Sequence, residues 1–300
     1  MGEIMELKVN NLAKMINKHV VLNDISFTVK QGEVLGIIGR NGVGKTTLFR
    51  TMMGQYLADQ GTVGIDDQLV SDDLELRQNM FFIDQQNNYL TDYTPAQIAK
   101  MYSLLYDKFD SDRFLTVVQE HHLPMDSRYR SYSKGMQGLF NVLLALASKA
   151  QFIILDEPLD GLDVLVRETV KRVLIDAVQT QHISILISSH NLTELDTLID
   201  RAIILADARI AREYTLESSR ENARKIQLVF REETPDFISE YGTIVEQRGR
   251  VIVVVFNDYN RKIDEMIAHS APLLFEDLPL NLEDLFRTTL VNEADYVLEK

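Results

Sequence analysis

The residues whose types and spacing best suit catalysis form one short loop, Gly39-Arg40-Asn41-Gly42-Val43-Gly44-Lys45-Thr46. This loop matches the phosphate-binding pattern G-x-x-x-x-G-K-[ST] at every fixed position. Its glycines have no Cβ to block backbone N–H groups that turn toward a polyphosphate. Lys45 can reach the β- and γ-phosphates, and the hydroxyl of Thr46 can hold Mg²⁺. We therefore predict that the loop, with Thr47 after it, binds a nucleoside triphosphate and Mg²⁺.

The segments on either side of the loop are suited to position it. Val34–Ile38 is a short apolar run of the kind that forms a buried strand. Thr47–Arg50 can open a helix, and the N-terminus of a helix presents its N–H groups to phosphate. A Gly-rich turn without function is the alternative. Strand, loop and helix in this order argue against it, because they are the context that the pattern requires.

Two acidic residues follow a second apolar run, Phe152–Leu155. Asp156 and Glu157 would then stand at the carboxyl end of a strand, where open α/β sheets bind their ligands. Asp156 can orient Mg²⁺ through water, and Glu157 can polarise the attacking water as general base. A surface acidic pair in a turn is the alternative, and the phosphate loop upstream argues against it.

Two further side chains follow predicted strands and are expected at the same edge of the sheet. His190 comes after Ile183–Ile187 and two serines, and it can hold the water or a γ-phosphate oxygen. Gln85 comes after Phe81–Ile83, and its amide could reach both Mg²⁺ and the water. A lone histidine is more often structural, however, and spacing alone does not decide between Gln85 and Gln86.

The elements that must position these residues alternate between strand and helix, which predicts a largely parallel sheet covered on both faces. Residues 1–31 instead alternate apolar and polar side chains, as strands with one wet face do. Residues from about 90 to 150 carry helical spacing and are predicted to form an insertion between two core strands. After about residue 215 the order becomes β-α-β-β-α-β, which suggests a ferredoxin-like domain.

Composition narrows the functional classes. A net charge of −14 argues against binding to nucleic acid or to anionic lipid. There is no cysteine, which excludes disulfides and thiolate metal sites. The N-terminus has no basic region followed by an apolar core, and no run approaches the ~18 apolar residues that span a bilayer. We therefore expect a cytoplasmic protein that would serve a membrane only through a partner.

A third segment completes an ordered series of motifs. Tyr132-Ser133-Lys134-Gly135-Met136-Gln137 resembles the signature loop of ATP-binding cassette (ABC) ATPases. Asp156-Glu157-Pro158-Leu159-Asp160-Gly161-Leu162-Asp163 resembles their strand carboxylates and the dimer loop that follows. The phosphate loop, Gln85 and His190 occupy the family's remaining motif positions in order. The resemblance covers about residues 5 to 215, and the form of the signature is most similar to subunits that power exporters of drugs and antibiotics.

This resemblance implies the fold class and its division. Residues 1–215 would form the nucleotide-binding domain, an α/β P-loop NTPase core with an N-terminal antiparallel β subdomain and the helical insertion at about 90–150. Residues 216–300 would form a small α+β accessory domain with the ferredoxin-like order. The resemblance also implies that Mg²⁺ is bound through Thr46, Gln85 and Asp156.

The resemblance further implies a mechanism shared between two chains. Two such domains pair head to tail, as a homodimer or a heterodimer, and ATP lies between one phosphate loop and the other chain's signature loop. Ser133 and Gly135, at a helix N-terminus, would meet the γ-phosphate of the partner's ATP, within a loop that includes Lys134 and Met136. Asp163 would contact the partner across the dimer. Hydrolysis would open the pair and drive a separate transmembrane permease.

Three positions depart from the usual family pattern. Ile16 stands where most members place an aromatic ring on adenine, and the lost stacking is worth about 0.5–1.5 kcal/mol. We therefore expect weak discrimination between ATP and GTP. Lys134 replaces a glycine of the signature loop, and we expect activity to survive. Gly138-Leu139 replaces a common Gln-Arg pair, and glycine in an early helical turn costs up to ~1 kcal/mol relative to alanine.

The function expected is therefore the ATP-hydrolysing subunit of an ABC exporter, peripheral on the inner face of the cell membrane through its permease. The alternative is a soluble ABC ATPase without a transport role. Glu157 and His190 argue against a nucleotide-binding regulator that does not turn over. Four apolar or aromatic residues either line a groove for the permease or belong to the core of the insertion: Tyr89, Leu90, Tyr93 and Tyr106.

Overall fold

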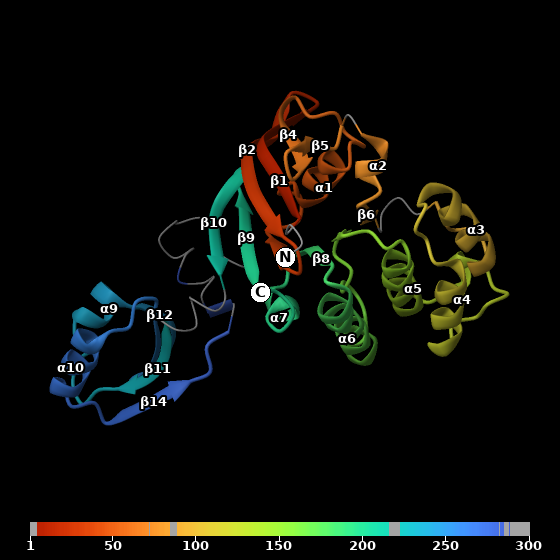
Figure 1. Ribbon diagram of the computed structural model, residues 1–300. Helices are drawn as coiled ribbons and strands as arrows, with labels where there is room; N and C mark the ends of the chain where they lie inside the picture. The colour runs from red at the N-terminus through yellow and green to blue at the C-terminus, as the bar shows by residue number, and fades with distance from the viewer. Residues whose placement is uncertain are drawn as a thin grey trace. The chain divides into compact units, whose positions relative to one another are not determined.

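The computed structural model describes residues 5–71, 73–84, 89–215, 223–281, 283–284 and 288. The chain divides into two compact units, Met1–Glu213 and Tyr214–Lys300, and each is described by itself (Figure 1). Gln85 and Gln86, the two candidates for the metal-binding glutamine, lie outside the described residues.

The first unit is built on a six-stranded sheet in the order β10-β9-β3-β8-β7-β6. The pairs β9-β3, β3-β8, β8-β7 and β7-β6 are parallel, as the alternation of strands and helices predicted. Every residue of the central strand β3 is buried, as in a strand covered on both faces. The strands span β3 Val34–Ile38, β6 Met80–Ile83, β7 Phe152–Leu155, β8 Ser184–Ser189, β9 Arg201–Ala206 and β10 Arg209–Thr215.

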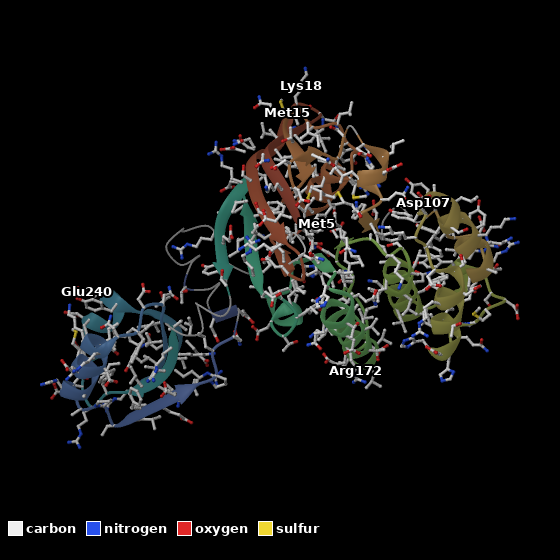
Figure 2. The ribbon with its side chains drawn as sticks, in the orientation of Figure 1. Met5, Met15, Lys18, Asp107, Arg172 and Glu240 are labelled. Atoms are coloured by element: carbon white, nitrogen blue, oxygen red, sulfur yellow. The ribbon has the colours of Figure 1, made fainter. Side chains whose placement is uncertain are left out.

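A second sheet of the same unit has the order β2-β1-β4-β5 and is antiparallel throughout. Its long strands β1 (Glu6–Ile16) and β2 (His19–Lys30) meet at Asn17-Lys18, whose φ values of 50° and 67° suit a two-residue hairpin turn. Met15 and Lys18 mark this end of the hairpin in Figure 2. The remaining strands are β4 (Gln60–Ile65) and β5 (Gln68–Leu69). One core joins the buried face of this sheet to β3 and α1.

The helical insertion lies between β6 and β7 in the chain and comprises α3 (Pro95–Leu105), α4 (Ser111–Glu120), the 3₁₀ turn η1 (Tyr129–Ser131) and α5 (Lys134–Ala147). Its core is rich in aromatic rings: Tyr106 lies 5.1 Å from Phe81 between ring centroids, and its hydroxyl donates to Met80 O at 3.0 Å. Tyr106 and the buried Leu90 therefore belong to the core. Tyr89 and Tyr93 are exposed.

Helices α1 (Lys45–Met52), α2 (Leu74–Arg77), α6 (Val164–Gln181) and α7 (Leu192–Leu195) complete the first unit. Helix α5 packs closely on Leu162 and on the first turn of α6 because two of its residues lack a side chain. A Cβ on Gly138 would lie 3.1 Å from Leu162 Cδ2, and one on Gly135 would lie 3.3 Å from Val166 Cγ2. Glycine at position 138 thus lowers the helix propensity of α5 but allows close packing at this point.

The second unit has the order β11-α9-β12-β13-α10-β14, and its sheet order is β12-β13-β11-β14 with every pair antiparallel. This is the ferredoxin-like arrangement that the sequence pattern suggested. Its core lies between the two helices and one face of the sheet. The elements span β11 Arg224–Val229, α9 Phe237–Tyr241, β12 Thr243–Arg248, β13 Val251–Phe256, α10 Arg261–His269 and β14 Leu274–Leu278.

Candidate nucleotide-binding site

The phosphate loop, residues 39–46, connects β3 to α1 and turns on its glycines. Gly42 and Gly44 have φ values of 82° and 113°, which L side chains rarely adopt. A Cβ on Gly39 would lie 2.7 Å from Val43 Cγ1, so a side chain does not fit there. Helix α1 begins within the loop, and the first N–H groups of a helix have no partner inside it. Those groups are available to bind phosphate.

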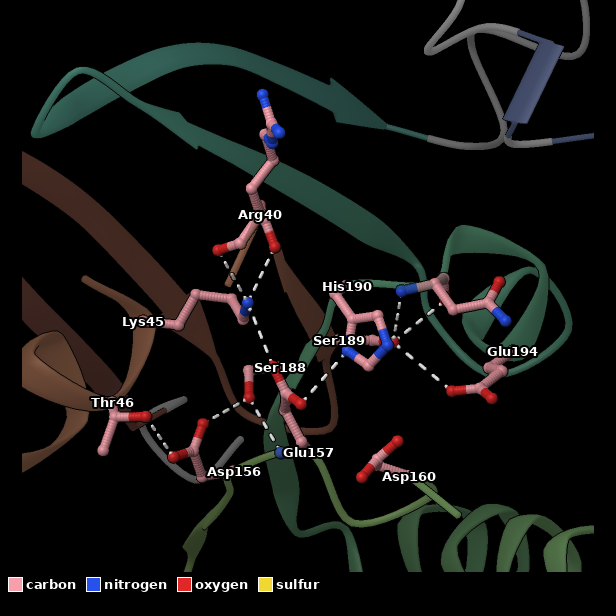
Figure 3. Close-up of polar contacts among 12 residues, drawn as sticks. Arg40, Lys45, Thr46, Asp156, Glu157, Asp160, Ser188, Ser189, His190 and Glu194 are labelled. Atoms are coloured by element: carbon pink, nitrogen blue, oxygen red, sulfur yellow. Dashed lines mark hydrogen bonds and ion pairs between the residues drawn. The ribbon is translucent and has the colours of Figure 1, made fainter. Parts of the chain in front are cut away.

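The Lys45 ammonium group lies at the centre of the site, with its side chain 4% exposed. Its Nζ donates to the carbonyl oxygens of Gly39 at 2.7 Å and Arg40 at 3.2 Å, and it lies 3.0 Å from Glu157 Oε1 (Figure 3). A buried cation with several partners is held in one place. Lys45 therefore supplies a fixed positive charge between the loop and the acidic strand end.

Two oxygen atoms that could bind a cation meet beside Lys45. Thr46 Oγ1 on α1 donates to Asp156 Oδ2, which follows β7, at 2.5 Å. Ser188, near the end of the neighbouring strand β8, connects Asp156 to the next residue: its Oγ donates to Asp156 Oδ1 at 2.6 Å and accepts from Glu157 N at 2.9 Å. Figure 3 shows this chain of contacts. Three elements of the fold thus fix the orientation of the Asp156 carboxylate.

Glu157 is held at both carboxylate oxygens. Oε1 faces Lys45, and Oε2 lies 3.1 Å from Nδ1 of His190. Glu157 also has a φ of 48°, an uncommon conformation for a residue with a side chain. Such backbone strain of order 1–3 kcal/mol persists where the surroundings over-determine it, and it clusters at active sites. The arrangement directs a carboxylate into the site and suits it to act as a base.

The residues present fit a magnesium ion. Mg²⁺ is usually bound through one or two carboxylates together with phosphate oxygens and water, and a cage of protein ligands is unusual. Within the described ranges no group of three or more His, Cys, Asp or Glu gathers as such a cage. Thr46 and Asp156 offer a hydroxyl and a carboxylate oxygen next to the phosphate loop.

Burial raises the pKa of Asp156 above its ordinary value of 3.8, and the hydrogen bonds from Ser188 and Thr46 oppose that rise. The nearby carboxylates of Glu157 and Asp84 raise the pKa of Asp156 further. A carboxylate that is costly to charge gains when a cation binds, because the cation compensates the desolvated negative charge. This electrostatic setting also favours a metal ion at Asp156.

These side chains surround an open cavity of about 550 Å³, large enough for a nucleotide. The cavity is lined by Asn41, Gly42, Gly44, Lys45, Thr46, Thr47, Arg50, Asp156, Glu157 and Asp160. Most of these residues were predicted from the sequence. The lining contains the N–H-rich loop, one buried lysine and the strand-end carboxylates, which is the set that binding a metal-bound triphosphate requires.

Other predicted residues lie around the cavity or apart from it. Gly39, Arg40 and Val43 shape the loop but do not line the cavity, and His190 is connected to it through Glu157. Ile16 is paired with His19 at the end of β1 and does not line it either.

The signature residues form the N-terminus of α5. Ser133 is the N-cap, and its Oγ accepts from Met136 N at 3.2 Å. Within the described part of the chain, none of the signature residues lines the nucleotide cavity: Ser133, Lys134, Gly135 and Met136. Asp163 caps α6 by accepting from Val166 N at 3.0 Å. The helix N-terminus at Ser133 is therefore separate from this chain's own phosphate loop.

Lys134 connects the signature segment to the acidic loop. Its Nζ lies 3.1 Å from Asp160 Oδ2, and Asp160 lines the cavity. The lysine side chain crosses over Gly161, where a Cβ would lie 2.2 Å from Nζ and where φ is 65°. Sequence reasoning assigned no role to Asp160, Ser188 or Arg50. Serine repeats and single charges carry no spacing signal, so only the fold could place these residues at the site.

A glycine-rich loop between a strand and a helix, a buried lysine, and a hydroxyl–carboxylate pair across neighbouring elements define the class of this site. It is the phosphate-binding site of a P-loop nucleoside triphosphatase.

Comparisons with known proteins narrow that class. The family model described as ABC transporter matches residues 22–160. The chain is 30% identical over 281 residues to the ABC transporter ATP-binding protein YtrB of Bacillus subtilis, covering 93% of this chain and 96% of the relative. It is 30% identical to the lipopolysaccharide export system ATP-binding protein LptB of Escherichia coli, and the match covers 68% of this chain and 88% of LptB. It is 26% identical to the bacitracin transport ATP-binding protein BcrA of Bacillus licheniformis, and the match covers 73% of this chain and 72% of BcrA.

Solved structures agree with the fold. The ATP-binding subunit of an ABC transporter matches with a TM-score of 0.64 and 25% identity, covering 72% of this chain and 92% of that chain. The dimeric structure of MJ0796, a bacterial ABC transporter cassette, matches with a TM-score of 0.63 and 21% identity, covering 70% and 98%.

The chain belongs to the ATP-binding subunits of ABC transporters. It is accordingly an ATPase, and its site binds ATP.

Proposed function

We propose that this chain is the ATPase subunit of an ABC exporter, in which two ATP-binding subunits close on two Mg²⁺-bound ATP molecules and drive a separate transmembrane permease. One observation carries this proposal. The phosphate loop and strand-end carboxylates line one cavity, whereas the exposed N-cap Ser133 and the rest of the signature lie outside it. A helix N-terminus without a nucleotide of its own suits the γ-phosphate in a second subunit.

The residues divide the chemistry as follows. Lys45 and the loop N–H groups bind the β- and γ-phosphates, and Thr46 and Asp156 hold Mg²⁺ with Gln85 as a further proposed ligand. When bound there, the metal would neutralise charge on the phosphate oxygens. Glu157 orients the attacking water and accepts its proton, and His190 fixes the Glu157 carboxylate at 3.1 Å. Ser133 and Gly135 of the second subunit complete the site, and Asp163 contacts that subunit.

The names of similar proteins support the exporter role and the pairing of two subunits. LptB is named for lipopolysaccharide export and BcrA for bacitracin transport, and MJ0796 is described as dimeric. Among the described residues, no helix has both the length and the apolar character to cross a membrane. The proposed transport role includes a membrane-spanning partner, and the subunit would work at the inner face of the membrane.

Complementation between two inactive variants tests the shared site. Lys45→Ala removes the phosphate-loop cation, and Ser133→Arg blocks the signature. Each variant alone should lose ATPase activity. In a mixture, half of the dimers combine one chain of each kind, and one of their two sites then has an intact Lys45 and an intact Ser133. We expect the mixture to recover up to about a quarter of the wild-type rate, because statistical pairing leaves about one site in four intact.

The control is Ser103→Arg, a substitution on an exposed face of α3. In a mixture with Lys45→Ala, the Ser103→Arg chains should keep their own ATPase activity unchanged. If the mixture of Lys45→Ala and Ser133→Arg remains inactive while both variants fold, the site is completed within one chain and the dimer proposal is wrong.

Copurification tests the transport role. The tagged chain, extracted from membranes in mild detergent, should bring down a protein with several membrane spans that raises its ATPase rate. Recovery of the chain only in the soluble fraction, with full ATPase activity, would favour the soluble ABC ATPase instead.

A further inference from the structure

Arg50 stands on the same face of α1 as the metal-binding Thr46. The two residues are four positions apart, and side chains at that spacing lie one above the other on a helix. Arg50 also lines the nucleotide cavity, and its side chain is only 14% exposed. The mechanism described above gives this buried guanidinium no role.

The Arg50 guanidinium forms an ion pair with one carboxylate, that of Asp84. Its Nε and Nη2 donate to Asp84 Oδ2 at 2.8 Å and 2.5 Å, and its Nη1 donates to the hydroxyl of Tyr56 at 2.9 Å. The Arg50 side chain is 14% exposed and the Asp84 side chain 6% exposed, so this ion pair is largely but not fully buried. Pairs of this kind are short and strong because donor and acceptor are both charged.

Asp84 and Asp156 occupy equivalent places on neighbouring strands. Strands β6 and β7 are parallel with Ile83 opposite Leu155, so the next residue of each strand is an aspartate. Asp156 N donates to Ile83 O at 3.4 Å, which keeps the two strand ends together. Helix α1 thus contacts both carboxylates from one face: Thr46 contacts Asp156 and Arg50 contacts Asp84.

We propose that Arg50 is a positioning residue for ATP hydrolysis, which neutralises Asp84 and so leaves Asp156 as the strand-end carboxylate available to Mg²⁺. Without Arg50, Asp84 would be a second carboxylate beside the metal site and would lack the guanidinium that offsets its charge. It would attract the cation to a position removed from the phosphates. This inference rests on the ATPase activity alone and is independent of the dimer and of transport.

A direct phosphate contact by Arg50 is the competing explanation, and a double-variant cycle separates the two. Arg50→Gln, Asp84→Asn and the double variant are compared for kcat, KM for ATP and the Mg²⁺ concentration at half-maximal rate. Removing one member of a buried pair leaves the other charge uncompensated, whereas removing both can be nearly neutral. If Arg50 acts through Asp84, the second substitution must repair the first. If Arg50 binds phosphate directly, Asp84→Asn cannot restore the lost contact.

We expect Arg50→Gln to lower kcat at least about tenfold, because the charge of Asp84 then draws the ion away from the phosphates. The same added negative charge attracts Mg²⁺ more strongly, so the half-maximal Mg²⁺ concentration should fall. The double variant should return both quantities to within about threefold of wild type. The matched control is the exposed pair Arg113–Glu120, 3.4 Å apart in the helical insertion. Arg113→Gln, Glu120→Gln and their combination should change neither quantity.

The proposal is overturned if Arg50→Gln keeps the wild-type kcat and Mg²⁺ dependence, or if the double variant is no better than Arg50→Gln. Thermal unfolding is recorded for each variant. Where Arg50→Gln fails to fold, the double variant decides the matter. A folded double variant that hydrolyses ATP within about threefold of wild type supports the proposal, and a folded but inactive one contradicts it.

Discussion

Thr46 Oγ1 lies 2.5 Å from Asp156 Oδ2, so the first turn of α1 and the end of β7 meet at one pair of oxygen atoms. Ser188 holds the other Asp156 oxygen at 2.6 Å from a third element. The proposed metal site is therefore built by the tertiary fold, with one proposed ligand from the phosphate loop and one from the sheet. Substitutions at either ligand should weaken metal binding more than they weaken folding.

Thr46→Ala should raise the Mg²⁺ concentration at half-maximal ATPase rate by about tenfold or more, because it deletes an oxygen ligand. Thr51→Ala is a matched control on the same helix, since Thr51 Oγ1 donates only to Thr47 O at 2.7 Å among the contacts described. Metal titrations at fixed ATP measure both. An unchanged Mg²⁺ dependence for Thr46→Ala would contradict the metal assignment.

Asp156 should make folding stability fall as pH rises. Burial raises the pKa of Asp156 above 3.8, so the folded chain holds this proton more tightly than the unfolded chain does. The resulting stability is fully present below about pH 3.8 and is lost as pH rises through the higher pKa of the folded state. Asp156→Asn removes this loss. The difference in thermal midpoint between Asp156→Asn and wild type should therefore grow in favour of the variant between pH 4 and pH 8.

The comparison is made in metal-free buffer, with Asp67→Asn as the exposed control. A difference in midpoint for Asp156→Asn that stays constant over the whole pH range would show that burial does not act on the charge of this group.

The Lys134–Asp160 ion pair should contribute little to folding or turnover. Its two side chains are 56% and 47% exposed, and exposed pairs are worth about 0–1 kcal/mol. Lys134→Gly, which creates the commoner signature form, should keep ATPase activity within about threefold of wild type and lower the free energy of unfolding by less than about 1 kcal/mol. Loss of activity in this folded variant would mean that the lysine itself contacts the nucleotide.

Ile16→Tyr should tighten ATP binding by about 0.5–1.5 kcal/mol if residue 16 covers the adenine ring. Wild-type affinities for ATP and GTP should differ by less than about tenfold. Met15→Tyr is the control, because neighbouring residues of β1 point to opposite faces. Calorimetric titration measures the nucleotide affinity of all three proteins, because its signal does not depend on the added tyrosine. Equal ATP affinity for Ile16→Tyr and wild type would place the base elsewhere.

Strong local patterns made the centre of the site predictable. The apolar run Val34–Ile38 forms β3 with the bounds expected, because a strand buried on both faces needs an uninterrupted apolar sequence. The order of elements in the second unit was also predicted, since its strands and helices have clear periodicity. Strand β10 was missed: most of Arg209–Thr215 is exposed and polar, so it has little apolar signal.

Contacts between distant segments were beyond sequence reasoning. The pairs Arg50–Asp84 and Lys134–Asp160 join residues whose meeting depends on how helices are placed on the sheet. No periodicity in the chain marks them. The sequence therefore predicted which residues bind phosphate, and the fold was needed to find the charged groups that lie around them.

The mass of Glu157→Gln in solution with ATP and Mg²⁺ shows whether two chains close on ATP that they cannot hydrolyse. Glu157 is the proposed base in a site completed by a second chain, so the variant should bind ATP, fail to hydrolyse it and remain closed as a pair. Light scattering should then give twice the mass of one chain with ATP and the mass of one chain without it. ATP consumption at the wild-type rate, or a single-chain mass while ATP stays bound and intact, would contradict the account.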